Sequence, residues 1–426
     1  MRILMKSDQT FGNLGDAAML RVAVTRLQTY CPNACLDVLT PRPDEFLRLF
    51  PHVNVLDAGA WSLWADELMF PGRLYRLLPR SWLAGVQQWE SSLREHAYTA
   101  FRPLARARCR RRHGSSQTLE RFFALLAAAD AVVVPGGGNL NDAFPYFAHG
   151  QLELAGIAKR LGKRVAFFGQ GLGPIRSACL RRRASRVLRS VDMLALREGR
   201  AGLPLARSLG LNEERIVVTG DDAIEPVWQM RPERLGDLLG LNVRIATYAG
   251  LGEREIAILR SVLAPAACQL GTHIIPIPID IEGAKCHSAP PDIAAIARII
   301  DRTSVLENLG QVNPSLEHVI ETVGRCRVVV TGSYHAGVFA MAQGISVVAL
   351  AKSDYYFSKF EGLADQFGAG CHVVNVAQPD AAEQIRQAVS KAWSCADEAR
   401  PLLLRAAETQ VAASRNAYRR FLQWHA

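Results

Sequence analysis

Apolar stretches that end in glycine-rich turns alternate with segments of helical length along most of this 426-residue chain. The first series of apolar stretches is RILMKS, ACLDVLT, AVVVPGGG, RVAFFGQGLG, MLALRE and RIVVTGDDA. A second series begins near VRIATYAGLG and continues through THIIPIPID, RTSVLENLG, RVVVTGSYHAG and ISVVALAKS. Continuously apolar strands separated by helices are typical of parallel strands that are buried on both faces of an α/β sheet. The pattern therefore predicts two α/β domains.

The boundary between the two predicted domains falls near PVWQMRPERLGDLLG, where proline and polar residues interrupt the pattern. We assign residues 1–235 to an N-terminal α/β domain that contains a helical insertion over about residues 61–125, rich in tryptophan and arginine. Residues 236–400 form a C-terminal α/β domain, and residues 401–426 form an amphipathic C-terminal helix. A chain of this length suits two domains of ordinary size. Two such domains fit an arrangement in which a ligand lies in the cleft between them.

The composition is that of a globular protein, with 49% hydrophobic and 21% charged residues. No stretch reaches the roughly 18 uninterrupted apolar residues of a membrane span, and the N-terminus lacks the apolar core of a secretory signal. The nine cysteines are scattered, and the CxxxC spacing of Cys31 and Cys35 has no second pair to complete a zinc site. We therefore expect reduced thiols, no metal site and a soluble, cytoplasmic protein.

The formal net charge of +10 is concentrated partly in the arginine-rich stretches FRPLARARCRRRHGSS and RSACLRRRASRVLRS. No interleaved aromatic platform or finger motif accompanies them, so we do not expect a nucleic-acid partner. Two interpretations of the tryptophan- and arginine-rich residues 61–112 stay open. These residues lie on the inner face of the cell membrane as a peripheral contact, or the tryptophans belong to the core and the arginines to a solvated surface.

Four glycine-rich turns follow predicted strands, which is where ligands approach open α/β sheets. The turns are FGNLGD, PGGGNLND, FGQGLGP and TGDDA. Glycine at any single turn can serve only to reverse the chain, but four turns at one edge indicate a binding site. None of them matches a phosphate loop or GxGxxG. The candidate ligand-binding residues in these turns are Asn13, Asp16, Gly136, Gly137, Gly138, Asn139, Gln170 and Asp222.

Two further strand ends carry side chains suited to chemistry. His335, in TGSYHAG, follows one strand and opens a helix, where it either exchanges a proton near neutral pH or packs beneath the helix. Arg197 ends MLALR, where a guanidinium makes either a salt bridge or a paired contact with an anion. The next turn, KSDYYFSKF, is either a solvated loop or a place for a sugar ring beside an anion. It clusters Lys352, Tyr355, Tyr356 and Lys359.

Taken in order, the motifs GNLGDAAML, VVVPGGGNLND, FFGQGLGPI, MLALRE, VTGDDA and SYHAGVFAMAQGISVVAL resemble the polysaccharide pyruvyl transferase family. The resemblance covers about residues 3–368. It implies a fold similar to the GT-B glycosyltransferases, with two Rossmann-like domains facing a cleft. It also implies transfer of the enolpyruvyl group of phosphoenolpyruvate to a saccharide, as a pyruvate ketal, in the synthesis of exopolysaccharide or another cell-surface polysaccharide. The acceptor is often lipid-linked, and phosphoenolpyruvate is a donor substrate, so no cofactor is implied.

The resemblance also implies roles for residues. His335 corresponds to a general acid that protonates the donor, Asp16 to a group that orients the acceptor or acts as base, and Arg197 to the arginine that holds the donor's anionic groups. We assign further donor-binding roles to Ser333, Tyr334, Lys352, Lys359, Gly136, Gly137, Gly138 and Gln170. We assign acceptor-binding roles to Asn13, Asn139, Asp222, Tyr355 and Tyr356.

One position departs from the family pattern, which commonly has an arginine two residues before the histidine. Here that position is Ser333, so Lys352 or Lys359 is a candidate to supply the missing cation. Two alternative functions stay open at this point. They are a GT-B-type glycosyltransferase that uses a nucleotide sugar, and a non-catalytic saccharide-binding member of an assembly complex.

Overall fold

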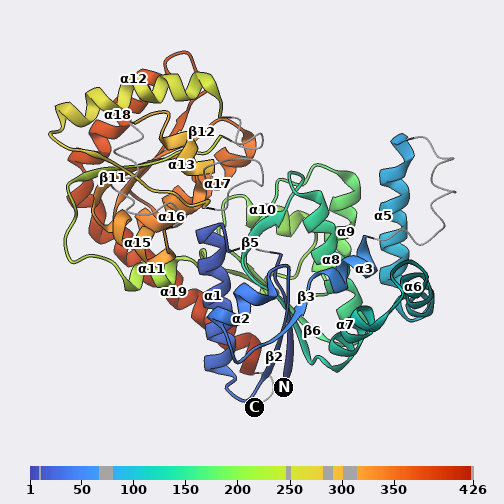
Figure 1. Cartoon of the computed structure of the whole chain (residues 1–426). Coiled ribbons are helices and arrows are strands. Elements are labelled where there is room, and N and C mark those ends of the chain that lie inside the picture. Colours follow the sequence, from blue (N-terminus) through green and yellow to red (C-terminus); the bar gives the residue numbers. More distant parts are fainter. Residues whose placement is uncertain (9–10, 67–79, 246–250, 282–290, 301–313, 424–426) are drawn as a thin grey trace.

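The computed structural model describes residues 1–8, 11–66, 80–245, 251–281, 291–300 and 314–423, which form two α/β domains as the hydrophobic pattern predicts (Figure 1). The first domain is built on a parallel sheet with the strand order β3-β2-β1-β4-β6-β7-β8, and β5 pairs with β6. Its strands are β1 (Arg2–Lys6), β2 (Cys35–Thr40), β3 (Asn54–Asp57), β4 (Ala131–Val134), β5 (Gly137–Leu140), β6 (Arg164–Leu172), β7 (Met193–Leu196) and β8 (Ile216–Val218).

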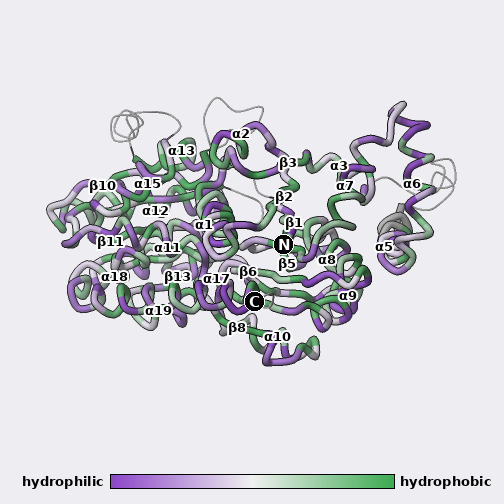
Figure 2. The backbone as a smooth tube through the Cα atoms, turned by 90° about the horizontal axis from the view of Figure 1, so that it is seen from below, coloured by the Kyte–Doolittle hydropathy of each residue, from purple (hydrophilic) through white to green (hydrophobic). Residues whose placement is uncertain are grey.

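Helices cover both faces of this sheet, as the continuously apolar strands require. The helices of this part of the chain are α1 (Leu14–Tyr30), α2 (Pro43–Leu49), α3 (Gly59–Ala65), α5 (Arg80–His96), α6 (Tyr98–His113), α7 (Gln117–Ala128), α8 (Pro145–Arg160), α9 (Ala178–Leu188), α10 (Gly202–Ser208) and α11 (Ile224–Gln229), with a short 3₁₀ turn at Glu213–Arg215. Of these, α5 packs on α8 and α6, and α11 packs mainly on helices of the second domain. In Figure 2, strands such as β6 are coloured mainly as hydrophobic, whereas the surrounding helices carry both colours. Mixed hydropathy of this kind is expected of helices that pack an apolar side on a sheet.

The second domain is built on a parallel sheet with the order β10-β9-β11-β12-β13. Its strands are β9 (Leu238–Asn242), β10 (Ile274–Pro276), β11 (Cys326–Thr331), β12 (Ser346–Ala351) and β13 (Cys371–Asn375). Its helices are α12 (Glu253–Gln269), α13 (Pro291–Ile296), α15 (Leu316–Gly324), α16 (Tyr334–Ala342), α17 (Asp354–Phe367), α18 (Ala381–Ser394) and α19 (Ala396–Leu422). The strand-like pattern at RTSVLENLG lies outside the described residues.

The insertion between β3 and β4 is helical and comprises α3, α5, α6 and α7. Two of its tryptophans, Trp61 and Trp64, are buried in the first domain's core, where Trp64 packs edge-on against Phe123 with ring centroids 5.5 Å apart. Trp89, by contrast, is 55% exposed. The interpretation that the tryptophans belong to the core is therefore confirmed for Trp61 and Trp64. The exposed Trp89 lies on α5, and α5 lies at the side of the first domain that faces away from the second domain (Figure 1).

The last helix, α19, begins at Ala396, before the predicted start at residue 401, and joins the two domains. It begins against the second domain, where Leu403 is part of the core. It ends against the first sheet, where the Tyr418 ring stacks on Phe168 at 3.7 Å and 11° (Figure 1). No described helix is both long and apolar enough to cross a membrane.

Candidate functional site

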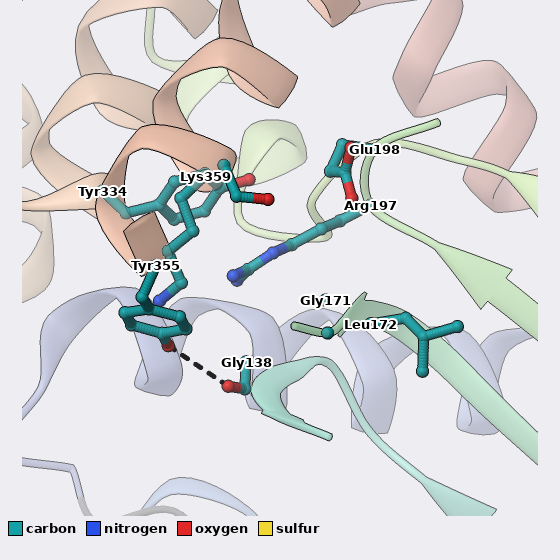
Figure 3. Close-up of a pocket in the computed structure, with 10 residues that line it drawn as sticks. Gly138, Gly171, Leu172, Arg197, Glu198, Tyr334, Tyr355 and Lys359 are labelled. Carbon is teal, nitrogen blue, oxygen red and sulfur yellow. Dashed lines mark hydrogen bonds between the residues drawn. The ribbon is translucent and has the colours of Figure 1, made fainter. Parts of the chain in front are cut away.

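A small cavity lies between the two domains, where loops at the carboxyl ends of both sheets meet (Figure 3). The space open to the centre of a water molecule is about 10 Å³, enough for about one water. The cavity is lined by Gly138, Gly171, Leu172, Gly173, Arg197 and Glu198 from the first domain and by Tyr334, Tyr355, Ser358 and Lys359 from the second.

Arg197 supplies a buried cation to this cavity, directly after β7. Its guanidinium lies over the Tyr334 ring, 4.1 Å from the centroid, and its Nη1 lies 3.5 Å from Oδ2 of Asp221. A Cβ atom on Gly171 or Gly138 would approach Arg197 Nη2 to 2.8 or 2.9 Å, so glycine at these turns makes room for the guanidinium. The two glycine turns thus position an arginine side chain as well as reversing the chain.

Lys359, on α17, supplies a second cation to the cavity and is partly buried. Its Nζ lies 4.1 Å from the centroid of the Tyr355 ring and 5.6 Å from that of Tyr334. Burial, with the nearby Arg197 guanidinium, lowers the pKa of the Lys359 ammonium well below its usual value. The nitrogen ends of Lys359 and Arg197 both lie near Gly138, where an added Cβ atom would fall 3.3 Å from Lys359 Nζ and 2.9 Å from Arg197 Nη2 (Figure 3). Two cationic groups therefore converge on one small space.

His335 occupies the first turn of α16 and lies at the contact between the domains. Its ring packs on Gly15 of α1, where any Cβ would fall 2.0 Å from its Cγ. Its Nε2 lies 3.7 Å from Oδ2 of Asp221, too far for a hydrogen bond, and has no hydrogen-bond partner in the part of the chain that the structure describes. Burial alone would raise the pKa of Asp221, but the neighbouring His335 and Arg197 hold it below its usual range.

Asp16, in the first turn of α1, belongs to the same group of charges. Burial raises the pKa of its carboxyl, although the nearby His335 and Lys359 act in the opposite direction. A carboxyl group with a raised pKa accepts a proton more readily, which suits a general base. The structure thus brings Asp16, Arg197, His335 and Lys359 together from four different elements.

Two other predicted residues join this group through the aromatic wall of the cavity. Tyr334 lies between Arg197 and His335, its ring edge-on to the imidazole at 5.4 Å. The Tyr355 hydroxyl donates a hydrogen bond to the Gly138 carbonyl oxygen at 3.3 Å, which links the second domain to the first (Figure 3).

Several predicted residues do not line the cavity but stabilise the turns next to it. The Ser333 N–H donates to Oγ1 of Thr331 at 2.8 Å, and this bond fixes the turn before α16. Gln170 is buried, and its amide nitrogen donates to the Pro135 carbonyl oxygen at 2.6 Å. The remaining residues of this kind are Gly136, which packs on Met19, Gly137, which pairs with Gln170, Asn139, which follows Gly138, and Tyr356, which packs on Phe360.

Three predicted residues are engaged elsewhere. The Asn13 side chain caps α1 by accepting from the N–H groups of Gly15 and Asp16. The Lys352 ammonium pairs with Glu255 at 2.9 Å and does not line the cavity. The Asp222 carboxylate is buried and accepts hydrogen bonds from Arg26, Ser414 and Tyr418.

Sequence reasoning missed three residues near the cavity. Asp221, and not its neighbour Asp222, faces Arg197 and His335. The Glu198 carboxylate lines the cavity and accepts from the N–H groups of Ala201 and Gly202, and Ser358 lines it from α17. Ser358 had a usable signal, because it lies three residues after Tyr355 and so shares its helix face. Among the described residues, no group of three or more His, Cys, Asp or Glu side chains is placed to hold a metal ion.

Solved structures with the same arrangement of domains share only 10–12% of their residues with this chain, so the likeness shows the fold alone. A Listeria monocytogenes protein described as a UDP-N-acetylglucosamine 2-epimerase has a TM-score of 0.57 at 12% identity, covering 97% of this chain and 93% of its own. The UDP-GlcNAc 2-epimerase of Methanocaldococcus jannaschii has a TM-score of 0.51 at 12% identity. The match covers 92% of this chain and 93% of the epimerase. A Rickettsia africae glycosyltransferase has a TM-score of 0.51 at 10% identity. The match covers 98% of this chain and 96% of the glycosyltransferase. The fold is therefore the predicted GT-B arrangement of two Rossmann-like domains.

In sequence, no curated protein matches the chain. The sequence model of one family, polysaccharide pyruvyl transferase, does match it over residues 13–354. That span contains Asp16, Arg197 and His335, and it ends just before Lys359. The agreement of this match with the motif order shows that the chain is a transferase of the polysaccharide pyruvyl transferase family.

Proposed function

We propose that this protein transfers the enolpyruvyl group of phosphoenolpyruvate to a saccharide, forming a pyruvate ketal during synthesis of exopolysaccharide or another cell-surface polysaccharide. The observation that supports the donor is the pair of cations, Arg197 and Lys359, that converges on one small cavity beside His335. Phosphoenolpyruvate carries a carboxylate and a phosphate on adjacent groups, so two cations of different shape match it. It is the donor substrate, and the proposal requires no cofactor.

The surroundings of the cavity favour an anionic donor in a second way. The N-terminus of α16 lies at the cavity, and Ser333 makes no side-chain hydrogen bond to cap it. Uncapped N–H groups and the positive end of the helix dipole attract a phosphate or a carboxylate. In this proposal Arg197 holds one anionic group through paired donors, and Lys359 holds the other as a point charge.

The proposed reaction begins with protonation of the donor and ends with loss of phosphate and closure of the ketal. His335 delivers a proton to the methylene carbon of the donor, which becomes a methyl group and leaves an oxocarbenium-like carbon. A saccharide hydroxyl attacks that carbon and loses its proton to a carboxylate, for which Asp16 and Asp221 are the nearest candidates. The carbon–oxygen bond to phosphate then breaks, with its electron pair leaving on phosphate. A second hydroxyl of the same saccharide closes the ketal as its proton leaves. Buried, preorganised charges stabilise such a transition state more than water does.

Phosphate release tests this function directly. With phosphoenolpyruvate and a panel of saccharides, we expect inorganic phosphate to appear only when an acceptor is present, with a mass gain on the saccharide that matches a pyruvate ketal. Phosphoenolpyruvate should also raise the melting temperature of the free protein, whereas a nucleotide sugar should not. Stabilisation by nucleotide sugars alone would instead point to a glycosyltransferase.

Replacing Lys359 with methionine is expected to weaken phosphoenolpyruvate binding by about 10- to 100-fold, the usual cost of losing one charge-assisted hydrogen bond. The pKa of Lys359 is lowered, so the wild-type residue loses its charge as the pH rises and affinity should fall with increasing pH. An arginine at this position stays charged, so Lys359→Arg should remove most of that fall. Calorimetric titrations at a series of pH values measure the effect. The donor's own titration affects all variants alike. Parallel pH profiles for the wild type and Lys359→Arg would contradict a titrating role for Lys359.

We further propose that the acceptor is lipid-linked and that the protein acts in the cytoplasm, at the inner face of the cell membrane. The cysteines among the described residues are all unbonded, which fits a reducing compartment. Helices α5 and α6 stand out from the first domain (Figure 1) and expose Trp89, Leu104 and the run Arg110, Arg111 and Arg112. An exposed indole ring and an exposed leucine on the same pair of helices as a run of arginines suit an anionic lipid surface.

A sedimentation experiment tests this contact. The protein is expected to sediment with phosphatidylglycerol vesicles at low salt and much less with phosphatidylcholine vesicles. Because the attraction is electrostatic, it should weaken at high salt. Changing Arg110, Arg111 and Arg112 to glutamate together should abolish it. Equal sedimentation of this variant and the wild type would contradict the membrane contact.

A further inference from the structure

We propose that a polar surface at the carboxyl end of β1 is the subsite that binds the neutral saccharide acceptor, an inference that rests on the function proposed above. We call this surface the β1–α8 subsite. None of its residues lines the cavity that contains Arg197 and Lys359. They are Lys6 and Asp8 at the end of β1, Asp66 just after α3, and Tyr146 and Gln151 on α8.

The centre of the subsite is a set of buried polar groups with one unfilled position. The Lys6 ammonium pairs with Oδ1 of Asp8, and the Gln151 amide nitrogen donates to Oδ2 of Asp8 at 3.2 Å. Gln151 is 4% exposed, and its Oε1 atom is buried without a hydrogen-bond partner in the described part of the chain. A buried acceptor left without a donor is energetically unfavourable. A hydroxyl group of a bound ligand would supply the donor.

The edge of the subsite is aromatic. Tyr146, in the first turn of α8, is 59% exposed, and its hydroxyl donates to Oδ2 of Asp66 at 2.7 Å. The Trp61 ring lies beneath Lys6, with its centroid 5.8 Å from Nζ. An exposed ring with a polar tip can cover the apolar face of a sugar while carboxylate and amide groups bind its hydroxyls. A saccharide site needs this combination.

The charge balance disfavours an anionic ligand and suits a neutral one. Asp8 neutralises Lys6, Gln151 is uncharged, and Asp66 adds one negative charge. The cavity between the domains, in contrast, presents Arg197 and Lys359. The β1–α8 subsite therefore suits a neutral, polyhydroxyl acceptor, whereas the cavity suits an anionic donor.

The β1–α8 subsite also lies within reach of that cavity. Phe144, the residue that precedes α8, packs edge-on against Tyr355 of the cavity with ring centroids 6.1 Å apart. Gln151 follows Phe144 by seven residues, or about 10 Å along the helix. This separation is comparable with the length of a disaccharide. A saccharide bound by Gln151 and Tyr146 can therefore direct a hydroxyl group toward the donor.

The test uses two variants with matched controls. Gln151→Leu removes the unpartnered amide oxygen, and Tyr146→Ala removes the exposed ring without disturbing the core. Gln343→Leu is the control for the first, since Gln343 is also a buried glutamine whose Oε1 lacks a partner in the described structure. Tyr30→Ala, at the end of α1, is the control for the second.

We expect each subsite variant to raise the acceptor KM by more than about tenfold while the KM for phosphoenolpyruvate stays within about twofold, because the lost bonds are to the acceptor alone. The controls should leave both constants unchanged. An unchanged acceptor KM, or an equal rise in both constants, would overturn the proposal.

A binding measurement keeps this inference separate from the proposed function. Saturation-transfer NMR with a panel of methyl pyranosides, without any donor, should detect binding to the wild type and to Gln343→Leu but not to Gln151→Leu or Tyr146→Ala. If this result is obtained while phosphoenolpyruvate is not turned over, the subsite stands and the proposed donor fails. If no pyranoside binds to the wild type, or if the subsite variants bind as well as it does, the β1–α8 subsite is wrong.

Discussion

Replacing His335 with glutamine is expected to lower acceptor-dependent phosphate release from phosphoenolpyruvate by roughly 10³-fold, the range that a positioned general acid contributes. Glutamine keeps a polar side chain of similar reach but cannot deliver a proton. Phosphoenolpyruvate binding should change by less than about twofold, because Arg197 and Lys359 remain in place. Rates from single-turnover phosphate assays and affinities from calorimetry measure the two effects separately.

His318 provides a matched control for this substitution. It lies on α15, and its Nε2 is buried without a hydrogen-bond partner in the described structure, as is that of His335. His318→Gln should retain the wild-type rate. If His335→Gln retained it as well, the acid would have to be another group. If His335→Gln lost donor affinity together with rate, the imidazole would serve mainly to hold the contact with Gly15 between the domains.

The sequence predicts those parts of the site that lie directly at strand ends. Arg197 follows β7 without a gap, and His335 follows β11 after a short turn, so the hydrophobic pattern alone places both at the edge where the domains meet. In each sheet the carboxyl ends of the parallel strands lie at one edge, and motifs more than 100 residues apart converge because these edges of the two sheets face each other. The order of the motifs then allowed the family to be identified, as the match over residues 13–354 confirms.

The choice between neighbouring candidates required the three-dimensional structure. Lys352 and Lys359 are alike in sequence, but Lys352 lies before the start of α17 and pairs with Glu255, a residue 97 positions earlier. Lys359 follows Tyr355 by four residues on the same helix, so the two share a face. The sequence alone leaves both lysines open as candidates, and no local pattern identifies Glu255 as the partner of Lys352.

The TGDDA turn presents the same difficulty. Adjacent aspartates after β8 point in different directions, and the direction of each is set by distant groups. Asp221 faces Arg197, whereas Asp222 faces Arg26 on α1 and the hydroxyl groups of α19, near the end of the chain. Contacts across about 190 residues leave no periodic signal, so the sequence could identify the turn but not the functional carboxylate.

The contacts of Asp222 also explain how α19 is held against the first domain. Its carboxylate accepts from Arg26 at 2.9 Å, from Ser414 at 2.5 Å and from the Tyr418 hydroxyl at 2.9 Å, and all of these groups are buried. The Arg26 guanidinium also lies over the Tyr418 ring, 5.0 Å from its centroid. Asp222 is therefore the common partner of one cation and two hydroxyl groups that come from two helices.

Replacing Asp222 with alanine is expected to destabilise the attachment of α19 by about 3–5 kcal/mol, because removing one member of a buried ion pair leaves its partners without compensation. Hydrogen exchange measured by mass spectrometry should show α19 amides exchanging about 10²- to 10³-fold faster, since each factor of ten corresponds to about 1.4 kcal/mol. The matched control is Glu317→Gln, which removes an exposed ion pair to Arg21 on the same helix α1 and should cost about 1 kcal/mol or less. Equal exchange in the two variants would contradict the role of Asp222, and slow exchange in Asp222→Ala would mean that the stacking of Tyr418 on Phe168 alone holds the helix.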